Sequence, residues 1–302
     1  MQGPMRTANN TNGATSYSHR PVWIVTDSTA DIPDGMANDL PITIVPLTVE
    51  VGGRSYRDGI DLSRDEFVER LRAGEWPRTS QPSVGAFRQT YIDLLEQGFD
   101  ILSIHIASSL SGTCNAAQSA AAMTEAERIR IIDSETVSMG FGWLALLAGQ
   151  LARQGGGLDE VASAIERRKG DQRVFAMLDT LEYLHRGGRI GRSASLLGSA
   201  LRIKPIIEIC YGAVEPRERV RTTRRALDRL VAIAEDQQPW EQLAVMHLGA
   251  EDASIALTER LAEQLPDLEI VRGQLGTVIG AYGGPGLVGI AGLARPTGAG
   301  GA

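Results

Sequence analysis

The first half of the chain alternates short apolar runs with segments of helical periodicity. Four apolar or β-branched runs predict strands, at residues 22–28, 42–51, 100–106 and 128–134. Apolar residues three or four positions apart predict helices, at residues 63–74, 84–98, 114–123 and 139–155. A turn-rich segment at 51–63 is expected to be a link. This alternation predicts a mainly parallel, doubly wound α/β sheet with helices on both faces.

The second half begins with the same alternation and then departs from it. Helical periodicity predicts helices, at residues 158–169, 180–188, 193–202, 222–237 and 252–265. Apolar runs predict strands, at residues 173–178, 243–249, 268–276 and 287–294, and a loop is expected at 277–286. The run from 204 to 220 predicts two strands joined as a hairpin at Tyr211 and Gly212. A hairpin within an α/β series predicts a mixed sheet, and therefore a second α/β domain.

Length and pattern together predict two domains behind a short tail. The 302 residues are too many for one small core. Residues 1–20 lack an apolar core, so we expect a disordered tail rather than a signal peptide. We expect an N-terminal α/β domain at 21–160 and a C-terminal α/β domain at 161–302. The most apolar helical run, residues 141–152, is too short to span a bilayer, so no stable membrane insertion is expected.

Composition argues against several classes of partner. Hydrophobic residues make up 43% of the chain and charged residues 22%, as in an ordinary soluble globular protein. A net charge of -7 and an aromatic fraction of 5% argue against nucleic acid. Cys114 and Cys210 have neither metal-ligand nor disulfide-framework spacing, which is typical of a protein of the reducing cytoplasm. We expect no metal site, because no His, Asp or Glu cluster has ligand spacing.

Two patterns that often mark enzymes are weak in this chain. Residues 284–289 match the dinucleotide pattern GxGxxG, but the segment after them is strand-like and no acidic residue follows Glu269. His105 and His247 lie within apolar strands, where a hydrogen-bonded core histidine is the expected state, and His185 is expected on a helix surface. A G-x-S-x-G elbow is absent from the sequence, so no serine hydrolase motif is present.

Hydroxyl side chains gather where strands end or helices begin. Residues 79–83 (TSQPS) precede the predicted helix at 84–98, and residues 108–113 (SSLSGT) follow the predicted strand at 100–106. Doubly wound sheets bind ligands at the carboxyl ends of their strands, and a helix start offers free N–H groups to an anion. A single Ser or Thr at a helix start is more often only a cap. The two segments together favour a cradle for an anionic group over caps alone.

Seven short motifs follow one another in a characteristic order, at residues 27–33 (DSTADIP), 79–83 (TSQPS), 108–113 (SSLSGT), 131–134 (IIDS), 181–190 (LEYLHRGGRI), 204–207 (KPII) and 284–286 (GPG). In this order they resemble the DegV family of bacterial fatty-acid-binding proteins, over nearly the whole chain after the tail. The resemblance implies two α/β domains, the first with a mainly parallel sheet and the second with a mixed sheet. It also implies a ligand tunnel between them that holds one long-chain fatty acid.

The resemblance implies a set of binding residues. In the family, the Thr of TSQPS and the Ser of LSGT bind the fatty-acid carboxylate, and here these are Thr79 and Ser111. Many members carry a His before the closing glycines, where this chain has Tyr282, whose phenol donates one hydrogen bond and stays neutral at pH 7. Five neighbouring residues are expected to support the head group: Ser28, Ser80, Gly112, Thr113 and Arg189.

The resemblance implies a carrier rather than an enzyme. The family protein presents its fatty acid to the catalytic subunit of a fatty-acid kinase, and the resulting acyl phosphate feeds phospholipid synthesis. The family's partner-facing arginine corresponds to Arg221. We therefore expect no catalytic residue and no cofactor, only a bound fatty acid such as palmitate. The alternative is a small-molecule phosphotransferase or hydrolase that uses Ser111 or Thr79, although the sequence offers no obvious general base beside either.

Overall fold

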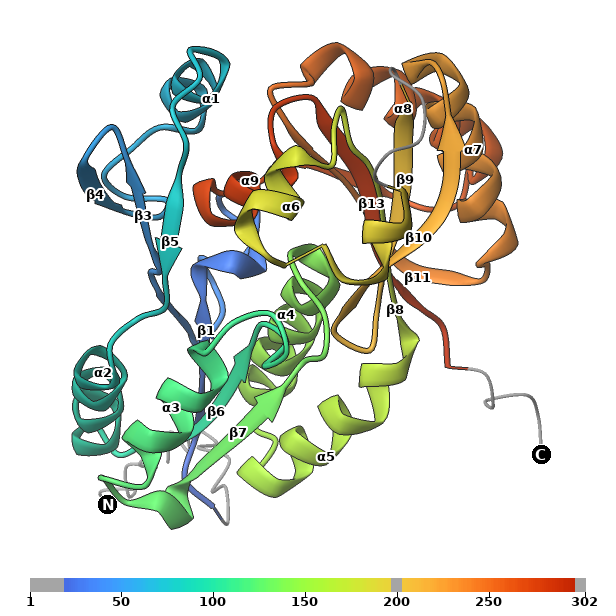
Figure 1. Cartoon of the computed structure of the whole chain (residues 1–302). Helices are drawn as coiled ribbons and strands as arrows, with labels where there is room; N and C mark the ends of the chain where they lie inside the picture. Colours follow the sequence, from blue (N-terminus) through green and yellow to red (C-terminus); the bar gives the residue numbers. More distant parts are fainter. Residues whose placement is uncertain (1–18, 197–202, 297–302) are drawn as a thin grey trace, which may run out of the picture.

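Two large β-sheets organise the chain (Figure 1). The computed structural model describes residues 19–196 and 203–296. The first sheet has four parallel strands in the order β2-β1-β6-β7. These strands are β1 (Val22–Asp27), β2 (Ile42–Val45), β6 (Asp100–His105) and β7 (Ile129–Asp133). The predicted parallel sheet is confirmed. Strand β2 lies on one side of β1 and strand β6 on the other, so the strand order reverses between β1 and β6, which is the topological switch point of the sheet.

Helices cover both faces of the first sheet, as the alternating pattern predicted. One face carries α2 (Val84–Glu96) and α3 (Thr113–Ala121), and the other carries α4 (Met139–Arg153) and α5 (Leu158–Arg168). Successive strand residues point to opposite faces. Ile101 accordingly belongs to the core beneath α2 and α3, whereas Leu102 belongs to the core that includes α4. Both faces of this sheet are therefore buried.

The second large sheet is mixed, as predicted. Its strand order is β10-β9-β8-β13-β11-β12, and only the β11–β12 pair is parallel. The strands are β8 (Gln172–Met177), β9 (Lys204–Cys210), β10 (Ala213–Val220), β11 (Trp240–Leu248), β12 (Ile270–Gln274) and β13 (Leu287–Ala294). Helices α7 (Thr223–Asp236) and α8 (Glu251–Gln264) pack on this sheet. Helix α4 also contacts it, because the Trp143 indole N–H donates to the Ala291 carbonyl at 3.0 Å.

A third, smaller sheet was not predicted. It is antiparallel, in the order β4-β3-β5, with β3 (Thr48–Val51), β4 (Arg54–Arg57) and β5 (Arg78–Ser80), and α1 (Arg64–Arg72) follows β4. The single strand expected at 42–51 is wrong, because Pro46 separates β2 from β3 and the two strands join different sheets. The segment expected to be only a link contains β4, and the TSQPS motif begins as strand β5 rather than as a helix start.

Two further predictions need correction or fall partly outside the described residues. The loop expected at 277–286 is wrong, since Thr277–Gly283 form helix α9. Helix α6 (Glu182–Gly187) matches its prediction and packs against α9. The helix predicted at 193–202 overlaps a 3-10 turn at Gly191–Leu196, and its remainder lies outside the described residues. The tail predicted at 1–20 also lies almost wholly outside them.

The domain boundary between residues 160 and 161 stays a prediction. The strands of the two large sheets fall on opposite sides of that boundary, since β7 ends at Asp133 and β8 begins at Gln172. Helix α5 spans the boundary and packs on β6 and β7 of the first sheet. Within the residues that the structure describes, no helix combines the length and the apolarity needed to cross a bilayer.

Candidate functional site

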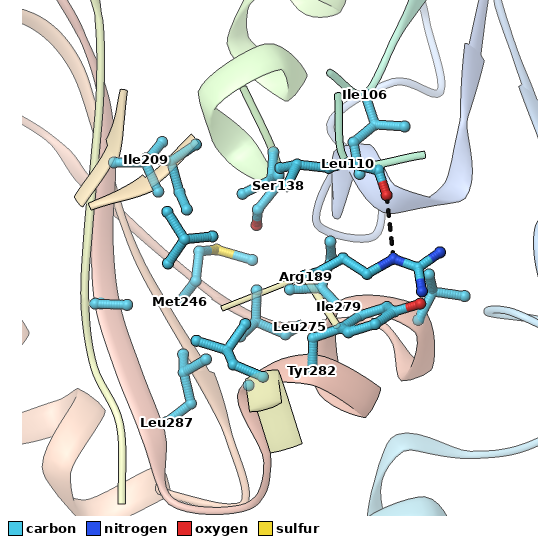
Figure 2. A pocket seen from close by; sticks show the side chains of 18 of the residues that line it. Ile106, Leu110, Ser138, Arg189, Ile209, Met246, Leu275, Ile279, Tyr282 and Leu287 are labelled. Carbon is cyan, nitrogen blue, oxygen red and sulfur yellow. Dashed lines mark hydrogen bonds between the residues drawn. The ribbon is translucent and has the colours of Figure 1, made fainter. Parts of the chain in front are cut away.

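A cavity of about 360 Å³ lies between the two large sheets, at the carboxyl ends of the first sheet's strands. Its volume is within the range of small-molecule sites. The segments after β2, β6 and β7 contribute Leu47, Ile106 and Val137. Leu110 adds to them from the loop after β6. Most of the apolar wall comes from the second half of the chain, and includes Val174, Phe175, Leu178, Ile207, Met246, Leu275, Val278, Leu287 and Ile290. Figure 2 labels Met246, Leu275 and Leu287 among them. These nine side chains are all buried, so the interior of the cavity is apolar.

Polar groups of the cavity include a hydrogen-bonded pair on β5 and α9. The Thr79 hydroxyl and the Tyr282 hydroxyl lie 2.5 Å apart, and either can be the donor. Both residues line the cavity and are half-buried. Thr79 is held by the small sheet, where it pairs with Val49 of β3. The structure therefore brings together two predicted binding residues that are 203 positions apart in the sequence.

Ser111 lines the same cavity from the loop between β6 and α3. Its hydroxyl lies 2.9 Å from that of Thr113 and accepts from the Thr113 N–H at 3.4 Å. Helix α3 begins at Thr113, with Gly112 as its N-cap residue, and no side chain caps it. Ser111 therefore lies just before the start of the helix, as predicted. A Cβ at Gly112 would overlap the amide of Gln81, which packs the two hydroxyl-bearing segments against each other.

Arg189 joins the two halves of the chain beside these hydroxyls. Its guanidinium Nε donates to the Leu110 carbonyl at 3.3 Å, and its Cζ lies 5.1 Å from the centre of the Tyr282 ring (Figure 2). The side chain is exposed and lines the cavity. A cation over an aromatic face is attracted by the ring. Arg189 thus gives the polar part of the cavity one positive charge near the Tyr282 phenol.

The Tyr282 ring is fixed by close packing on α6. A Cβ at Gly187 would lie 2.5 Å from Tyr282 Cδ1, so only glycine lets the α6 backbone approach the ring this closely. Helix α9 ends at Gly284, which has φ of +73°, a conformation that glycine adopts without strain. The glycines of GxGxxG therefore end a helix and lead into strand β13, which excludes the dinucleotide interpretation of the motif.

The supporting residues predicted around the head group have different positions. Ser80 and Arg189 line the cavity, whereas Ser28, Gly112 and Thr113 do not. The Ser28 hydroxyl accepts from the Leu47 N–H at 3.1 Å and so orders the chain after β2. Ser83 caps α2 by accepting from the Ala86 N–H. Arg221 is exposed after β10 and is not part of the cavity wall.

Sequence patterns did not identify two polar residues that line the cavity, Gln81 and Ser138. Gln81 lies inside the TSQPS motif, but the sequence predicted binding roles only for Thr79 and Ser80 of that motif. Ser138 is buried, has φ of +54°, and its hydroxyl has no hydrogen-bond partner among the described residues. Figure 2 shows that hydroxyl pointing toward the interior of the cavity. A positive φ at a non-glycine residue has no signature in a single sequence.

A second hydrogen-bonded set, away from the cavity wall, has the composition of a hydrolase triad. His105 Nδ1 lies 2.9 Å from Asp27 Oδ2, and His105 Nε2 lies 2.7 Å from the Ser103 hydroxyl, which also contacts the Tyr91 hydroxyl at 2.8 Å. All four side chains are fully buried, and none lines the cavity. His105 is therefore the hydrogen-bonded core histidine that the sequence predicted. His185 is exposed on α6, also as predicted.

The described residues, 19–196 and 203–296, contain no group of three or more His, Cys, Asp or Glu side chains that could hold a metal ion. His247 is buried, and its Nε2 lies 3.0 Å from Glu251 Oε2. Cys114 and Cys210 are both free thiols. The polar chemistry that the cavity offers is therefore hydroxyls, amides and one guanidinium.

The fold and the site define a class of α/β proteins that enclose an apolar pocket with polar groups between two sheets. A model of the family described as "Uncharacterised protein, DegV family" matches residues 21–295. The chain belongs to the DegV family.

Curated relatives match over almost their whole length. A DegV domain-containing protein of Streptomyces coelicolor is 40% identical over 275 residues, which cover 90% of this chain and 98% of that protein. Protein DegV of Bacillus subtilis is 32% identical over 274 residues, which cover 89% of this chain and 98% of that protein.

Solved structures of fatty-acid-binding DegV proteins share the fold. The protein described as "Fatty Acid Binding of a DegV family Protein from Thermus thermophilus" has a TM-score of 0.85 and 34% identity, and the match covers 91% of this chain and 100% of that one. DegV of Bacillus subtilis, described as a fatty acid binding protein, has a TM-score of 0.82 and 31% identity, with coverage of 91% and 100%.

Proposed function

We propose that this chain binds a long-chain fatty acid, with the acyl chain in the cavity and the carboxylate at Thr79, Ser111 and Tyr282. The observation that carries the proposal is the division of the cavity into a buried apolar interior and a half-buried group of hydroxyls. A fatty acid has the same division. The solved relatives from Thermus thermophilus and Bacillus subtilis, which bind fatty acids, support it.

The acyl chain supplies most of the affinity in this proposal. Burying ten methylenes contributes ~8 kcal/mol at ~0.8 kcal/mol each, which offsets a large part of the cost of association. The head group then needs satisfied hydrogen bonds rather than a strong ion pair. Neutral hydroxyls at Thr79, Ser111 and Tyr282 hold a carboxylate less tightly than a bidentate arginine does. Such a site suits a ligand that is passed on to another protein.

The chain would act as a carrier that presents its fatty acid to the catalytic subunit of a fatty-acid kinase in the cytoplasm. The free thiols of Cys114 and Cys210 fit a reducing compartment. A phosphotransferase or hydrolase is less well supported, since Ser111 hydrogen-bonds Thr113 and no histidine lines the cavity within the described residues. The triad-like set around His105 is buried away from substrate.

Denaturing mass spectrometry of an organic extract of the purified protein tests the binding proposal. We expect about one fatty acid per chain, and exchange with added palmitate or oleate. A matched pair of variants is Ser111→Ala, in the cavity wall, and Ser119→Ala, on the exposed face of α3. The first should lower occupancy and the second should not. A protein that carries no fatty acid and takes up neither palmitate nor oleate would rule the proposal out.

Arg221 provides a separate test of the presentation step. With a bacterial fatty-acid kinase and ATP, Arg221→Ala should slow acyl-phosphate formation while leaving palmitate affinity unchanged, because Arg221 is exposed and lies outside the cavity wall. Arg224→Ala, three residues further on in α7, is the matched control. Equal rates for the wild type and Arg221→Ala would show that this arginine does not contact the kinase.

A further inference from the structure

Two buried carboxyl groups hold the N-terminus of α9, the helix that carries Tyr282. Asp31 Oδ1 accepts from the Gly276 N–H at 2.8 Å. Asp58 Oδ1 accepts from the Thr277 N–H at 2.7 Å and from the Thr277 hydroxyl at 2.8 Å. Asp31 is 4% exposed and Asp58 3% exposed. These contacts attach the Gly-rich helix α9 to the first half of the chain, more than 200 positions away in the sequence.

The two carboxyl groups are close to each other. A Cβ at Gly276 would lie 2.9 Å from Asp31 Oδ1 and 3.0 Å from both oxygens of Asp58, so both groups contact the same point of the backbone. The other oxygen of each, Oδ2, has no hydrogen-bond donor among the described residues. The Ser138 hydroxyl is near Asp31 but lacks hydrogen-bond geometry. A proton shared between the two carboxyl groups would satisfy both oxygens and remove the repulsion of two buried negative charges.

The surroundings favour keeping that proton. Burial raises the pKa of Asp31 to about 8, and the charge of Asp58 raises it as well. The Ser138 hydroxyl, the Gly276 N–H and the guanidinium of Arg64 act in the opposite direction. Asp58, after β4, and Arg64, at the start of α1, are the charged groups that act on Asp31. The groups that act on Asp31 from the starts of α4 and α9 are the Ser138 hydroxyl and the Gly276 N–H, and neither carries a charge.

We propose that Asp31 and Asp58 share one proton and that this pair positions α9, and with it the Tyr282 phenol, beside Thr79. Loss of the proton leaves two buried carboxylates beside each other at the start of α9, and their mutual repulsion and desolvation oppose the favourable interaction of a carboxylate with a helix N-terminus. Helix α9 then loosens and the contact between Tyr282 and Thr79 is lost. The consequence for fatty-acid affinity rests on the proposed function, whereas the effect on α9 does not.

The shared proton makes the free energy of unfolding depend on pH. The pKa of Asp31 is higher in the folded chain than the ordinary value of 3.8. The unfolded chain therefore loses this proton at lower pH than the folded chain does. The contribution is fully present below pH 3.8, falls as the pH rises toward about 8, and is constant above that value. In Asp31→Asn the amide still accepts from Gly276 and can donate to Asp58, and this pH dependence disappears.

Chemical unfolding of the ligand-free chain between about pH 5 and 9 tests the pair directly. The free energy of unfolding of the wild type should fall relative to that of Asp31→Asn as the pH rises. Asp34→Asn, at an exposed carboxyl three residues away, should parallel the wild type. Parallel curves for the wild type and Asp31→Asn would overturn the proposal. If Asp31→Asn does not fold, Asp58→Asn should shift the fall to lower pH, because it removes one charge beside Asp31.

Two local measurements connect the pair to the site. Between about pH 7 and 9, amide exchange of α9, corrected for the intrinsic rate, should increase about tenfold in the wild type and stay constant in Asp31→Asn. Affinity for palmitate should fall about tenfold over the same range in the wild type alone. Unchanged α9 exchange in the wild type would refute the pair as the positioning element. A loosened α9 in a protein that binds no fatty acid would refute the proposed function and leave the pair intact.

Discussion

Two hydrogen-bonded groups of hydroxyl-bearing residues differ mainly in their access to solvent. The set of Asp27, His105, Ser103 and Tyr91 is fully buried beneath α2. The pair of Thr79 and Tyr282 is half-buried and lines a cavity. The first set has the composition of a catalytic triad and cannot meet a substrate in this fold. The second has no general base and is open to a ligand.

Hydrogen-bond geometry alone does not identify a functional site in this fold. Ser103 and His105 are two positions apart on β6, so both point to the same face of the sheet, and Asp27 ends the neighbouring strand β1. Parallel pairing therefore brings the three together inside the core, where each buried polar group finds a partner. We infer that the buried set stabilises the fold and that the cavity hydroxyls bind the ligand.

The largest expected effect comes from breaking the buried set. His105→Ala removes one hydrogen-bond partner from Asp27 Oδ2 and one from the Ser103 hydroxyl, and it opens a cavity beside Phe87. The free energy of unfolding should fall by ~3–5 kcal/mol, the typical cost of removing one member of a buried pair. Urea unfolding measures it, with His185→Ala on the exposed face of α6 as the control. A His105→Ala protein that is as stable as the wild type but has lost a hydrolytic activity would show that the buried set is catalytic rather than structural.

Much of this arrangement could be predicted from the sequence. Apolar runs located the strands that carry Asp27 and His105, because those strands are buried on both faces and read as continuous hydrophobic segments. The motifs around Thr79 and Ser111 predicted which hydroxyls would gather. The cavity that these residues line depends on two sheets meeting, which local periodicity does not encode.

The elements that the sequence did not predict depend on contacts with residues far away in the chain. Helix α9 has three glycines among the residues 277–284 and weak intrinsic propensity, so the sequence favoured a loop there. The contacts that hold it are made by distant parts of the chain: Asp31 and Asp58, more than 200 positions earlier, accept from its start, and α6 packs against it. Strands β4 and β5 are short edge strands of a small sheet and have no continuous apolar run. Tertiary contacts decided these three elements.

An intermediate effect is expected at Thr79. Thr79→Val keeps the branched shape on β5 and removes the hydroxyl, so affinity for palmitate should fall by ~1.5–3 kcal/mol, the worth of one hydrogen bond to a charged group. The free energy of unfolding should change little, because the Tyr282 hydroxyl is half-buried and can contact water instead. Thr48→Val, on the neighbouring strand β3 and outside the cavity wall, is the control. Calorimetric titration measures the affinity. A lower free energy of unfolding with unchanged palmitate affinity would show that Thr79 has a structural role, like the buried set, and does not bind the ligand.

The smallest effect is expected at Tyr282, where the phenol meets Thr79 from the opposite half of the chain. Tyr282→His replaces a neutral donor with a group whose ordinary pKa is about 6.5. Near pH 8 the affinity for palmitate should lie within about threefold of the wild type, since both rings offer one neutral donor. Near pH 6 the imidazolium should attract the carboxylate and raise the affinity severalfold. Tyr282→Phe, which has no donor, controls for protonation of the fatty acid itself. An identical pH profile for Tyr282→His and Tyr282→Phe would show that position 282 does not contact the head group.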